Sequence, residues 1–590
     1  MEMPQFRPWR CTLHETFLIL AFVFLFPLTA WSGQAKYIFL FIGDGMGISQ
    51  RSAAQEYAGR TLLMNTFPAQ GVTATHSADR FITGSAAAGT AIACGQKTNT
   101  GYVGMDPEQQ EVMSVAELAK EQGKKVGIIS SVYIDHATAA SFYAHVPFRG
   151  QYYDIAVALA ESGFDYFAGG GLKALENNTG NSLEYKANAW ELIRDSGYSI
   201  VRSRQEFEEL KPGAGKVMAI NPKLRNGQTL PYAMDQREQD ISLAEFTAKG
   251  IELLDNEDGF FIMVEGGKID WACHANDGAA AVHDILAFEQ ALHKAYTFYE
   301  QHPEETLILV TGDHECGGMS LGSAGTGYDT NFGLLSSQKV SSQKFARDII
   351  PELKEQEQSF EQIKPVITQM FGLTFQGDPD NSLYLKPHEK EKIEKAFERS
   401  MAGKEAENEN VYLPYGGSDS LSVTLTRILN HKAGIGWTSY THTGVPVITS
   451  AVGSGSEMFN GSYDNTEIGL RVMEIMGCAS KLHYTPEVKT RNALGKALAS
   501  TSGNQACSPG LPARNGPSCP SGPDAECPGT LERSAWRPEY IFRAHVDRCC
   551  HPGGRSSFGH WRTGRIHCRM CSNFRLYTIW PNNRYPEYGQ

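Results

Sequence analysis

Five short apolar runs alternate with segments of helical periodicity, and this alternation constrains the fold more than any other feature of the chain. The runs are KYIFLFIG (36–43), KKVGIISSV (124–132), GFFIMVEG (259–266), ETLILVTG (305–312) and VPVITSAVG (445–453). Between them, residues 111–123 and 281–302 have the apolar spacing of helices. Strands that alternate with helices predict a mostly parallel sheet covered on both faces. We therefore expect an α/β fold, a three-layer α/β/α sandwich.

The chain is longer than such a sheet requires. Its 590 residues predict one large domain with additions. Residues 325–410 are charged, helical in pattern and without a strand-like run, so we interpret them as an inserted helical subdomain, called the insert below. The main core is then expected at 36–324 and 411–478, and a helix predicted at 418–432 is expected to return to it.

The N-terminal segment has the pattern of a secretory signal peptide. Arg7 and Arg10 precede an apolar run at 17–30, which small residues follow. The run is short for a membrane span, although a membrane anchor stays open as the alternative. We predict a signal peptide at 1–30, a secreted or periplasmic protein, and no stable membrane span after cleavage.

The C-terminal segment 479–590 differs in composition from the rest of the chain. It is rich in Arg, Cys and Pro, holds seven of the twelve cysteines, and shows no amphipathic period. Cys568 and Cys571 form a C-x-x-C pair, so a metal-binding or disulfide module is one interpretation. We prefer a tail that is disordered or derived from a frameshift.

The overall charge argues against two classes of partner. The net charge is −13 at pH 7. A strongly acidic chain is repelled by nucleic acids and by anionic membrane surfaces. We therefore expect no nucleic acid recognition.

Carboxylate and imidazole side chains follow the predicted strands. They are Asp44 after the first run, Thr138 in DHAT after the second, Glu265, Asp270 and His274 in EGGKIDWACH, Asp313 and His314 after the fourth, and His442 in THTG near the last. In open α/β sheets, ligands bind at the carboxyl ends of the strands. Three Asp and three His suit two zinc-like ions, and the Thr and Glu suit a harder ion such as magnesium.

Each of these residues alone has a structural explanation. Asp44 could cap a turn, Asp270 and His274 could form a surface pair on one helix face, and His442 could be a satisfied buried histidine. The gathering of all of them at one edge of a sheet is much harder to obtain from structural needs alone. A metal centre is therefore the preferred interpretation.

Ser85 is the candidate nucleophile. It stands in FITGSAAAGTAIACG (81–95), among small residues before a predicted helix. The free N–H groups and the dipole at a helix N-terminus favour an anion, and a metal ion can lower the pKa of a serine hydroxyl. A plain N-cap is the alternative role. Arg149 in AHVPFRG supplies a guanidinium that matches two phosphate oxygens.

Taken together, these motifs resemble the alkaline phosphatase family over about 36–317 and 415–478. The resemblance rests on GDGMG, TGSAAAGTA, HAT with AHV-x-x-R, VEGGKID-x-x-x-H, TGDHE and THTG, in that order. It implies two Zn²⁺ ions and one Mg²⁺ ion, a phosphoserine formed at Ser85, and an Arg149 clamp on the phosphate. The implied ligands are Asp44, Asp313 and His314 for one zinc, Asp270, His274 and His442 for the other, and Asp44, Thr138 and Glu265 for magnesium.

The sequence departs from the family pattern at several positions. Gly84 stands where many members have an Asp that braces the arginine, so Arg149 is expected to be held less firmly. His136 and Trp271 differ from the residues that some members have near magnesium and near the phosphate. Cys273 and Cys316 flank the predicted zinc ligands, and we interpret both as buried small residues.

These observations predict a metal-dependent phosphomonoesterase of broad specificity that acts on small-molecule phosphate monoesters. The resemblance also implies a homodimer in which the insert forms a crown-like region. A phosphodiesterase or sulfatase of the same superfamily is the first alternative. A non-catalytic, secreted phosphate- or metal-binding protein is the second, and the complete set of ligands with Ser85 argues against it.

Overall fold

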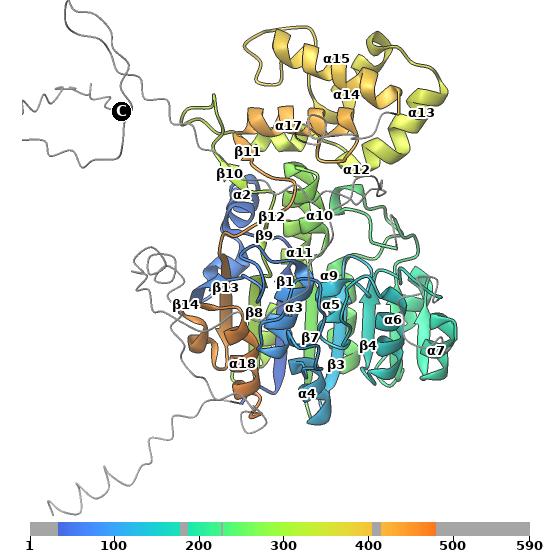
Figure 1. Cartoon of the computed structure of the whole chain (residues 1–590), viewed down its shortest axis with the longest axis vertical. Helices are drawn as coiled ribbons and strands as arrows, with labels where there is room; N and C mark the ends of the chain where they lie inside the picture. The colour runs from blue at the N-terminus through green and yellow to red at the C-terminus, as the bar shows by residue number, and fades with distance from the viewer. Residues whose placement is uncertain (1–33, 177–186, 226–227, 404–412, 414, 479–590) are drawn as a thin grey trace, which may run out of the picture. The chain divides into compact units, whose positions relative to one another are not determined.

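A ten-stranded sheet forms the centre of the molecule (Figure 1). The computed structural model describes residues 34–176, 187–225, 228–403, 413 and 415–478. The sheet order is β14 (Gly461–Asp464), β2 (Ala69–Ala74), β13 (Val447–Gly453), β8 (Thr306–Gly312), β1 (Tyr37–Gly43), β7 (Phe260–Glu265), β3 (Lys125–Ser130), β4 (Tyr166–Gly169), β6 (Lys216–Ile220) and β5 (Tyr198–Val201). The signal peptide predicted at 1–30 and the tail at 479–590 lie outside the described residues.

All five predicted strands are confirmed, as β1, β3, β7, β8 and β13. The sheet is parallel except for β13, which runs antiparallel to both β8 and β2. The exception has a geometric reason: β13 follows directly on the segment that carries His442, at the carboxyl ends of the other strands. A strand that begins at that edge must run away from it. We call this edge the carboxyl edge of the sheet.

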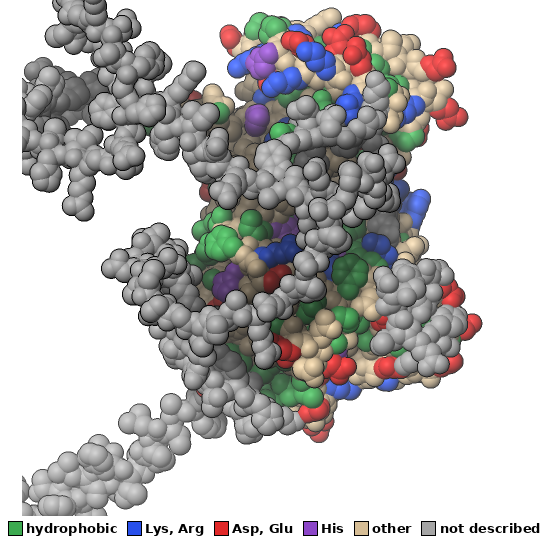
Figure 2. Space-filling model, in the orientation of Figure 1, with side chains coloured by type: hydrophobic (Ala, Val, Ile, Leu, Met, Phe, Trp, Pro, Cys, Tyr) green, Lys and Arg blue, Asp and Glu red, His purple; other side chains and the backbone are tan. Residues whose placement is uncertain are grey.

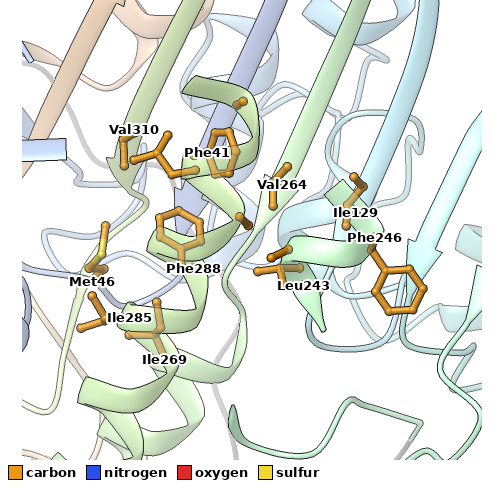
Figure 3. Close-up of a cluster of buried hydrophobic side chains, with 14 of the residues drawn as sticks. Phe41, Met46, Ile129, Leu243, Phe246, Val264, Ile269, Ile285, Phe288 and Val310 are labelled. Carbon is orange, nitrogen blue, oxygen red and sulfur yellow. The ribbon is translucent and has the colours of Figure 1, made fainter. Parts of the chain in front are cut away.

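Helices cover both faces of the sheet, so the predicted α/β/α sandwich is confirmed. Strand β1 is buried throughout and sends Phe39 and Phe41 into one apolar cluster and Ile38 and Leu40 into another. Figure 3 shows the first cluster, in which Phe288 lies beside Phe41. Such two-sided burial explains why the strands read as continuous apolar runs.

The helices divide between the two faces. One face is covered by α2 (Ile48–Ala58), α8 (Arg204–Glu209), α9 (Leu243–Leu254), α10 (Lys268–His274) and α11 (Gly278–Gln301). The other is covered by α3 (Ser85–Cys94), α4 (Val115–Glu121), α5 (Ala137–Ala140), α6 (Tyr152–Glu161), α7 (Ala189–Asp195) and α18 (Thr466–Ile475). Short 3₁₀ turns occupy η1 (Leu63–Thr66), η2 (Ala233–Asp235) and η5 (Ser456–Phe459). None of the described helices is both long and apolar enough to cross a membrane.

The described part of the insert is mainly helical. It contains η3 (Phe332–Ser337), α12 (Ser342–Lys344), η4 (Phe345–Ile349), α13 (Ile350–Glu355), α14 (Phe360–Phe371) and α15 (Pro387–Met401). Acidic and basic side chains are interspersed over its surface (Figure 2). A third apolar cluster lies inside it and includes Phe345, Ile363 and Phe371.

The helix predicted at 418–432 forms as α17 (Ser420–Ala433), but most of its buried apolar side chains pack away from the main core, which Ala433 at its end joins. Leu421, Leu425 and Leu429 belong to the third cluster together with the insert helices. The main core is already filled on both faces of the sheet, so the apolar stripe of α17 packs against the insert instead. In packing terms, α17 is therefore part of the insert.

Candidate active site

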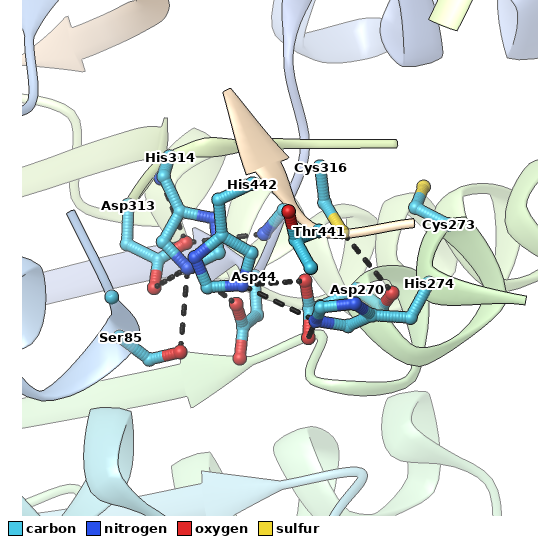
Figure 4. Close-up of polar contacts among 12 residues, drawn as sticks. Asp44, Ser85, Asp270, Cys273, His274, Asp313, His314, Cys316, Thr441 and His442 are labelled. Carbon is cyan, nitrogen blue, oxygen red and sulfur yellow. Dashed lines mark hydrogen bonds and ion pairs between the residues drawn. The ribbon is translucent and has the colours of Figure 1, made fainter. Parts of the chain in front are cut away.

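The ten predicted site residues lie together at the carboxyl edge of the sheet. Figure 4 shows Ser85 with the Asp and His residues among them, Asp44, Asp270, His274, Asp313, His314 and His442. Asp44 follows β1, Glu265 ends β7, Asp313 and His314 follow β8, Thr138 lies in α5 beyond β3, Asp270 and His274 lie on α10, Ser85 opens α3, and Arg149 precedes α6. His442 lies in the short strand β12 (His442–Thr443), which pairs with β9 (Glu315–Cys316). A second short ladder joins β10 (Met319–Leu321) to β11 (Ile435–Trp437).

The first ligand cluster surrounds His314. Its Nε2 lies 3.4 Å from Oδ1 of Asp44 and 3.3 Å from Oδ2 of Asp313. The same Nε2 lies 3.3 Å from Oγ of Ser85. The donor atoms of Asp44, Asp313 and His314 all lie within 4.8 Å of one another. This spacing lets one ion bind all three side chains next to the serine hydroxyl.

Helix α10 and strand β12 build the second cluster. Nε2 of His274 lies 3.2 Å from Oδ2 of Asp270, and Nε2 of His442 lies 3.5 Å from Oδ1 of the same carboxylate. The two imidazole nitrogens are 3.2 Å apart. The rings of His442 and His314 stack with their centroids 3.6 Å apart, so the two clusters are adjacent.

The third cluster shares Asp44 with the first. His136, Glu265 and Asp44 offer donor atoms within 4.8 Å of one another. Nδ1 of His136 lies 3.1 Å from Oε1 of Glu265, and Oγ1 of Thr138 lies 3.5 Å from Oδ2 of Asp44. Because it also contains an imidazole, this cluster is a mixed nitrogen and oxygen site rather than a purely oxygen site.

Several buried carboxylate oxygens in these clusters lack a hydrogen bond. Oδ1 of Asp44, Oδ1 of Asp270 and Oδ2 of Asp313 accept no hydrogen bond from any described residue. Buried carboxylate oxygens in folded proteins are almost always satisfied. Three unsatisfied oxygens that face imidazole nitrogens therefore fit bound cations, and the Asp and His donor set fits zinc.

The charge distribution agrees with cation binding. Burial, followed by repulsion from the neighbouring carboxylates, raises the pKa of Asp44 well above its usual range. Burial and the proximity of Asp270 raise the pKa of Asp313 to about 8. Burial keeps the pKa of His314 well below its usual value, so its imidazole is neutral and can act as a ligand. Mutually repelling carboxylates beside the neutral imidazole of His314 are an arrangement that a divalent ion would stabilise.

Ser85 is the first helical residue of α3 and is 2% exposed. Gly84 is the N-cap, and the first turn consists of Ser85, Ala86 and Ala87. The first N–H groups of a helix have no acceptor within the helix and attract an anion.

Arg149 approaches the site from the side of the third cluster. Its Nη2 lies 3.0 Å from Nε2 of His136, and within the described ranges it forms no ion pair with a carboxylate. A Cβ at Gly84 would meet nothing within 4 Å, so the position expected to hold a bracing acid is open. The guanidinium is therefore held by an imidazole alone.

Residues behind the ligands, which the sequence analysis did not single out, orient the imidazoles. Nδ1 of His274 lies 2.5 Å from the carbonyl oxygen of Tyr440, and Nδ1 of His442 lies 2.9 Å from that of Thr83. These contacts leave Nε2 of both rings directed into the second cluster. Both partners are backbone carbonyls, which no side-chain pattern could reveal.

Glu315 was also missed as a functional residue, although it stands in the TGDHE motif next to His314. It is 3% exposed and accepts hydrogen bonds from Nε2 of Gln50 (2.7 Å), N of Gly318 (3.2 Å), N of Met319 (3.1 Å) and the hydroxyl of Thr443. Through Thr443 it fixes the β9–β12 ladder that carries His442.

Glu315→Gln is expected to weaken zinc binding about tenfold, because loss of support behind a ligand commonly has that effect. An amide cannot accept from all four donors, so the melting temperature should also fall by about 4 °C. Zinc titration with a competing chelator and thermal unfolding measure the two effects. Glu245→Gln is the matched control, because this residue caps α9 away from the site. Unchanged zinc affinity in Glu315→Gln would show that Glu315 does not position His442.

Cys273 and Cys316 are buried thiols, as interpreted from the sequence. Burial raises the pKa of both well above the usual value, so both carry their protons. Sγ of Cys316 lies 3.7 Å from the backbone oxygen of Asp270. The same Sγ lies within 4.8 Å of donor atoms of Asp270, His274 and His442, at the margin of the second cluster.

Comparisons with known proteins agree with the fold. The family model described as alkaline phosphatase matches residues 35–479. Alkaline phosphatase 4 of Bacillus subtilis is 30% identical over 459 residues, which cover 75% of this chain and 89% of that protein. The crystal structure of a cold-active alkaline phosphatase from a psychrophilic Shewanella superposes with a TM-score of 0.62 at 26% identity and covers 75% of this chain and 99% of that one.

The alkaline phosphatase of Thermus thermophilus is similar to the same extent, with a TM-score of 0.61, 27% identity, and coverage of 78% of this chain and 95% of that one. The matches extend across the main core and the insert rather than over one motif. The chain therefore belongs to the alkaline phosphatase family of phosphomonoester hydrolases.

Proposed function

We propose that this protein hydrolyses small-molecule phosphate monoesters through a phosphoserine at Ser85, with two zinc ions and one magnesium ion. The observation that carries the proposal is the position of Ser85. Its Oγ lies 3.3 Å from Nε2 of His314, at a helix N-terminus and beside two adjacent ligand clusters. Membership of the alkaline phosphatase family supports the same reaction.

The side chains have the following roles in this proposal. Asp44, Asp313 and His314 hold the zinc beside Ser85; Asp270, His274 and His442 hold the other; Asp44, Thr138 and Glu265 hold magnesium, with His136 beside them. When bound, these ions lower the pKa of the serine hydroxyl and of a water molecule and neutralise phosphate charge. Arg149 donates hydrogen bonds to the non-bridging oxygens.

Two displacements complete the reaction. Ser85 loses its hydroxyl proton and its Oγ attacks phosphorus as the bond to the alcohol oxygen breaks. The leaving oxygen takes up a proton, and the alcohol leaves on the side of His274 and His442. Water then attacks the phosphoserine, the P–Oγ bond breaks, and Ser85 regains its proton as inorganic phosphate leaves. The first-turn N–H groups of α3 stabilise the negative charge near Ser85 in both steps.

One assay panel distinguishes this reaction from the alternatives. An aryl phosphate monoester, an aryl phosphate diester and an aryl sulfate are compared at alkaline pH, before and after chelation and after zinc and magnesium are returned. We expect monoester turnover to dominate and to follow the metals. A dominant diester or sulfate activity would favour the phosphodiesterase or sulfatase, and no activity in metal-loaded protein would favour a binding protein.

Gly84→Asp is expected to slow the release of phosphate. Gly84 has φ −122° and ψ 164°, a conformation open to any residue, and the space around its Cβ is empty. A carboxylate there would brace Arg149 and tighten phosphate binding, so inhibition by inorganic phosphate should strengthen about tenfold while kcat falls.

Gly84→Asn is the matched control, since it adds the same shape without charge. Steady-state inhibition and the burst of alcohol release measure both variants. If the Asp and Asn variants behave like the parent protein, Arg149 is not loosened by the missing acid.

We further propose that the protein is exported by the signal peptide at 1–30 and acts as a homodimer with the insert as a crown-like region. The pattern of the N-terminal segment supports the first statement, and the family resemblance supports the second. N-terminal sequencing of exported protein and light scattering of purified protein test them. Deletion of 497–590 should leave activity intact, and loss of activity in a folded truncation would contradict our interpretation of the tail.

A further inference from the structure

A cavity of about 630 Å³ lies between the second ligand cluster and the insert. Trp271, His274 and Tyr440 line it on the side of the main core. Gln343 and Arg347 line it from α12 and η4, and the loop before α17 contributes Ser418. Figure 1 shows α12 and α17 beyond the end of α10. The cavity therefore extends from His274, a predicted zinc ligand, to the insert, which has no role in the proposed reaction.

The cavity lies on the side from which the alcohol would leave. Ser85 contacts His314, and from there the stacked ring of His442 leads to His274, whose side chain lines the cavity. In an in-line displacement, the leaving oxygen is opposite the attacking Oγ. The group bonded to that oxygen would therefore extend past His274 and into the cavity.

The walls combine aromatic and hydrogen-bonding groups. Trp271, Tyr440 and Tyr232 are aromatic, and the structure fixes two of them. Arg427 donates a hydrogen bond of 2.6 Å to the hydroxyl of Tyr440, and Nζ of Lys268 lies 3.6 Å from the ring centre of Tyr232. Rigid aromatic faces bind planar rings by stacking.

The charge of the cavity is set mainly by Arg347. It is exposed and forms no ion pair with a carboxylate in the described part of the chain. The one carboxylate in the lining, Asp419, is engaged as the N-cap of α17, where it accepts from N of Ser422 at 2.8 Å. The amide of Gln343 and the hydroxyl of Ser418 add directional hydrogen-bonding groups. Such a lining suits a planar, polar ring better than an aliphatic chain.

Resting on the proposed function, we propose that this cavity binds the alcohol portion of the substrate and that it selects nucleosides. The nucleobase would stack on the aromatic wall, and Arg347, Gln343 and Ser418 would bond to its polar edge and to the ribose. The volume lies within the range of small-molecule sites and accommodates a nucleoside. Nucleoside 5′-monophosphates are then better substrates than small aliphatic monoesters.

The test compares kcat/KM for adenosine 5′-monophosphate and for glycerol 2-phosphate. We expect the parent protein to favour the nucleotide about tenfold, the size of one stacking contact. Ala346→Phe fills the cavity from η4, and Arg347→Ala removes its free cation. Each substitution should lower kcat/KM for adenosine 5′-monophosphate about tenfold and leave kcat/KM for glycerol 2-phosphate nearly unchanged. Ala346→Ser is the matched control, because it keeps the cavity open.

Two readouts separate this inference from the proposed function. Loss of all monoester turnover in metal-loaded parent protein would overturn the proposed function. Binding of adenosine to Ser85→Ala, measured by calorimetry with and without Ala346→Phe, tests the cavity without turnover, and no binding would overturn the inference. Equal kcat/KM for both substrates in the parent protein, or a stronger preference for a hexose phosphate, would also overturn it.

Discussion

Ser85→Ala is expected to lower kcat for a phosphate monoester at least about thousandfold, because in the proposed reaction this residue supplies the atom that attacks phosphorus. The substitution removes one oxygen at a position where the first turn of α3 is already rich in alanine, so the fold should persist. Zinc content should stay the same, since Ser85 contacts His314 but belongs to none of the three ligand clusters. The variant thus separates loss of the nucleophile from loss of the metals.

Acid quenching followed by mass spectrometry tests the covalent step directly. Phosphate should be found on Ser85 in the parent protein and on no residue of the variant. Ser114→Ala is a suitable control, because Ser114 caps α4 and its loss costs about 1 kcal/mol of stability without touching the site. Undiminished turnover in Ser85→Ala, or phosphate on another residue, would refute the assigned nucleophile.

Asp44→Asn is expected to reduce phosphate monoester turnover about as severely as Ser85→Ala, for a different reason. Asp44 belongs to two ligand clusters at once, so the substitution weakens two cation sites. Metal analysis of the purified variant should show loss of zinc next to Ser85 together with loss of the third ion. Asp240→Asn is a useful control, because Asp240 is a paired carboxylate that contacts Arg237 and Asn221 rather than the site.

The same substitution should stabilise the metal-free protein. Burial and neighbouring carboxylates raise the pKa of Asp44 well above its usual range, and the pKa of Asp313 is raised to about 8. The folded chain then binds more protons than the unfolded chain, so the contribution of these groups to stability falls as pH rises from about 4 to about 8. The Asn variant lacks one of these charges and should melt a few degrees higher, about 3 °C, at pH 8 without metals.

Thermal unfolding at pH 5 and at pH 8, with and without zinc, measures this effect. The melting midpoint of the metal-free parent protein should decrease from pH 5 to pH 8. The midpoint of the metal-loaded protein should change much less. A metal-free parent protein that is as stable at pH 8 as at pH 5 would show that the carboxylates do not repel one another as inferred.

The strands and the position of the site could be predicted from the sequence because both depend on local patterns. A strand buried on both faces is a continuous apolar run, as in β1 and β8, and Asp44 and Asp313 follow those runs directly. The short edge strands β5 and β14 lack this signal, since half or more of their side chains are partly or fully exposed. The direction of β13 depends on the edge of the sheet at which the preceding loop ends.

The remaining features could not be predicted from the sequence, because they depend on interactions between distant segments. The packing of α17 against the insert depends on which apolar surface remains free after the main core has formed. Glu315 accepts hydrogen bonds from donors at positions 50, 318, 319 and 443. The donors at 50 and 443 are distant in sequence, so the local motif does not reveal them. The cavity beside Trp271 exists because the main core and the insert meet there. No pattern along the chain encodes such a meeting.

The separate apolar cluster of the insert affects how an enzyme of this design can diverge in evolution. Phe345, Phe371 and Leu425 stabilise one another without the side chains of the sheet, so changes among them need not disturb Asp44 or Asp313. One wall of the cavity can therefore mutate while the ligand-bearing loops stay under purifying selection. Paralogues that share this scaffold would then differ in the alcohols they release and agree in how they hold the phosphate.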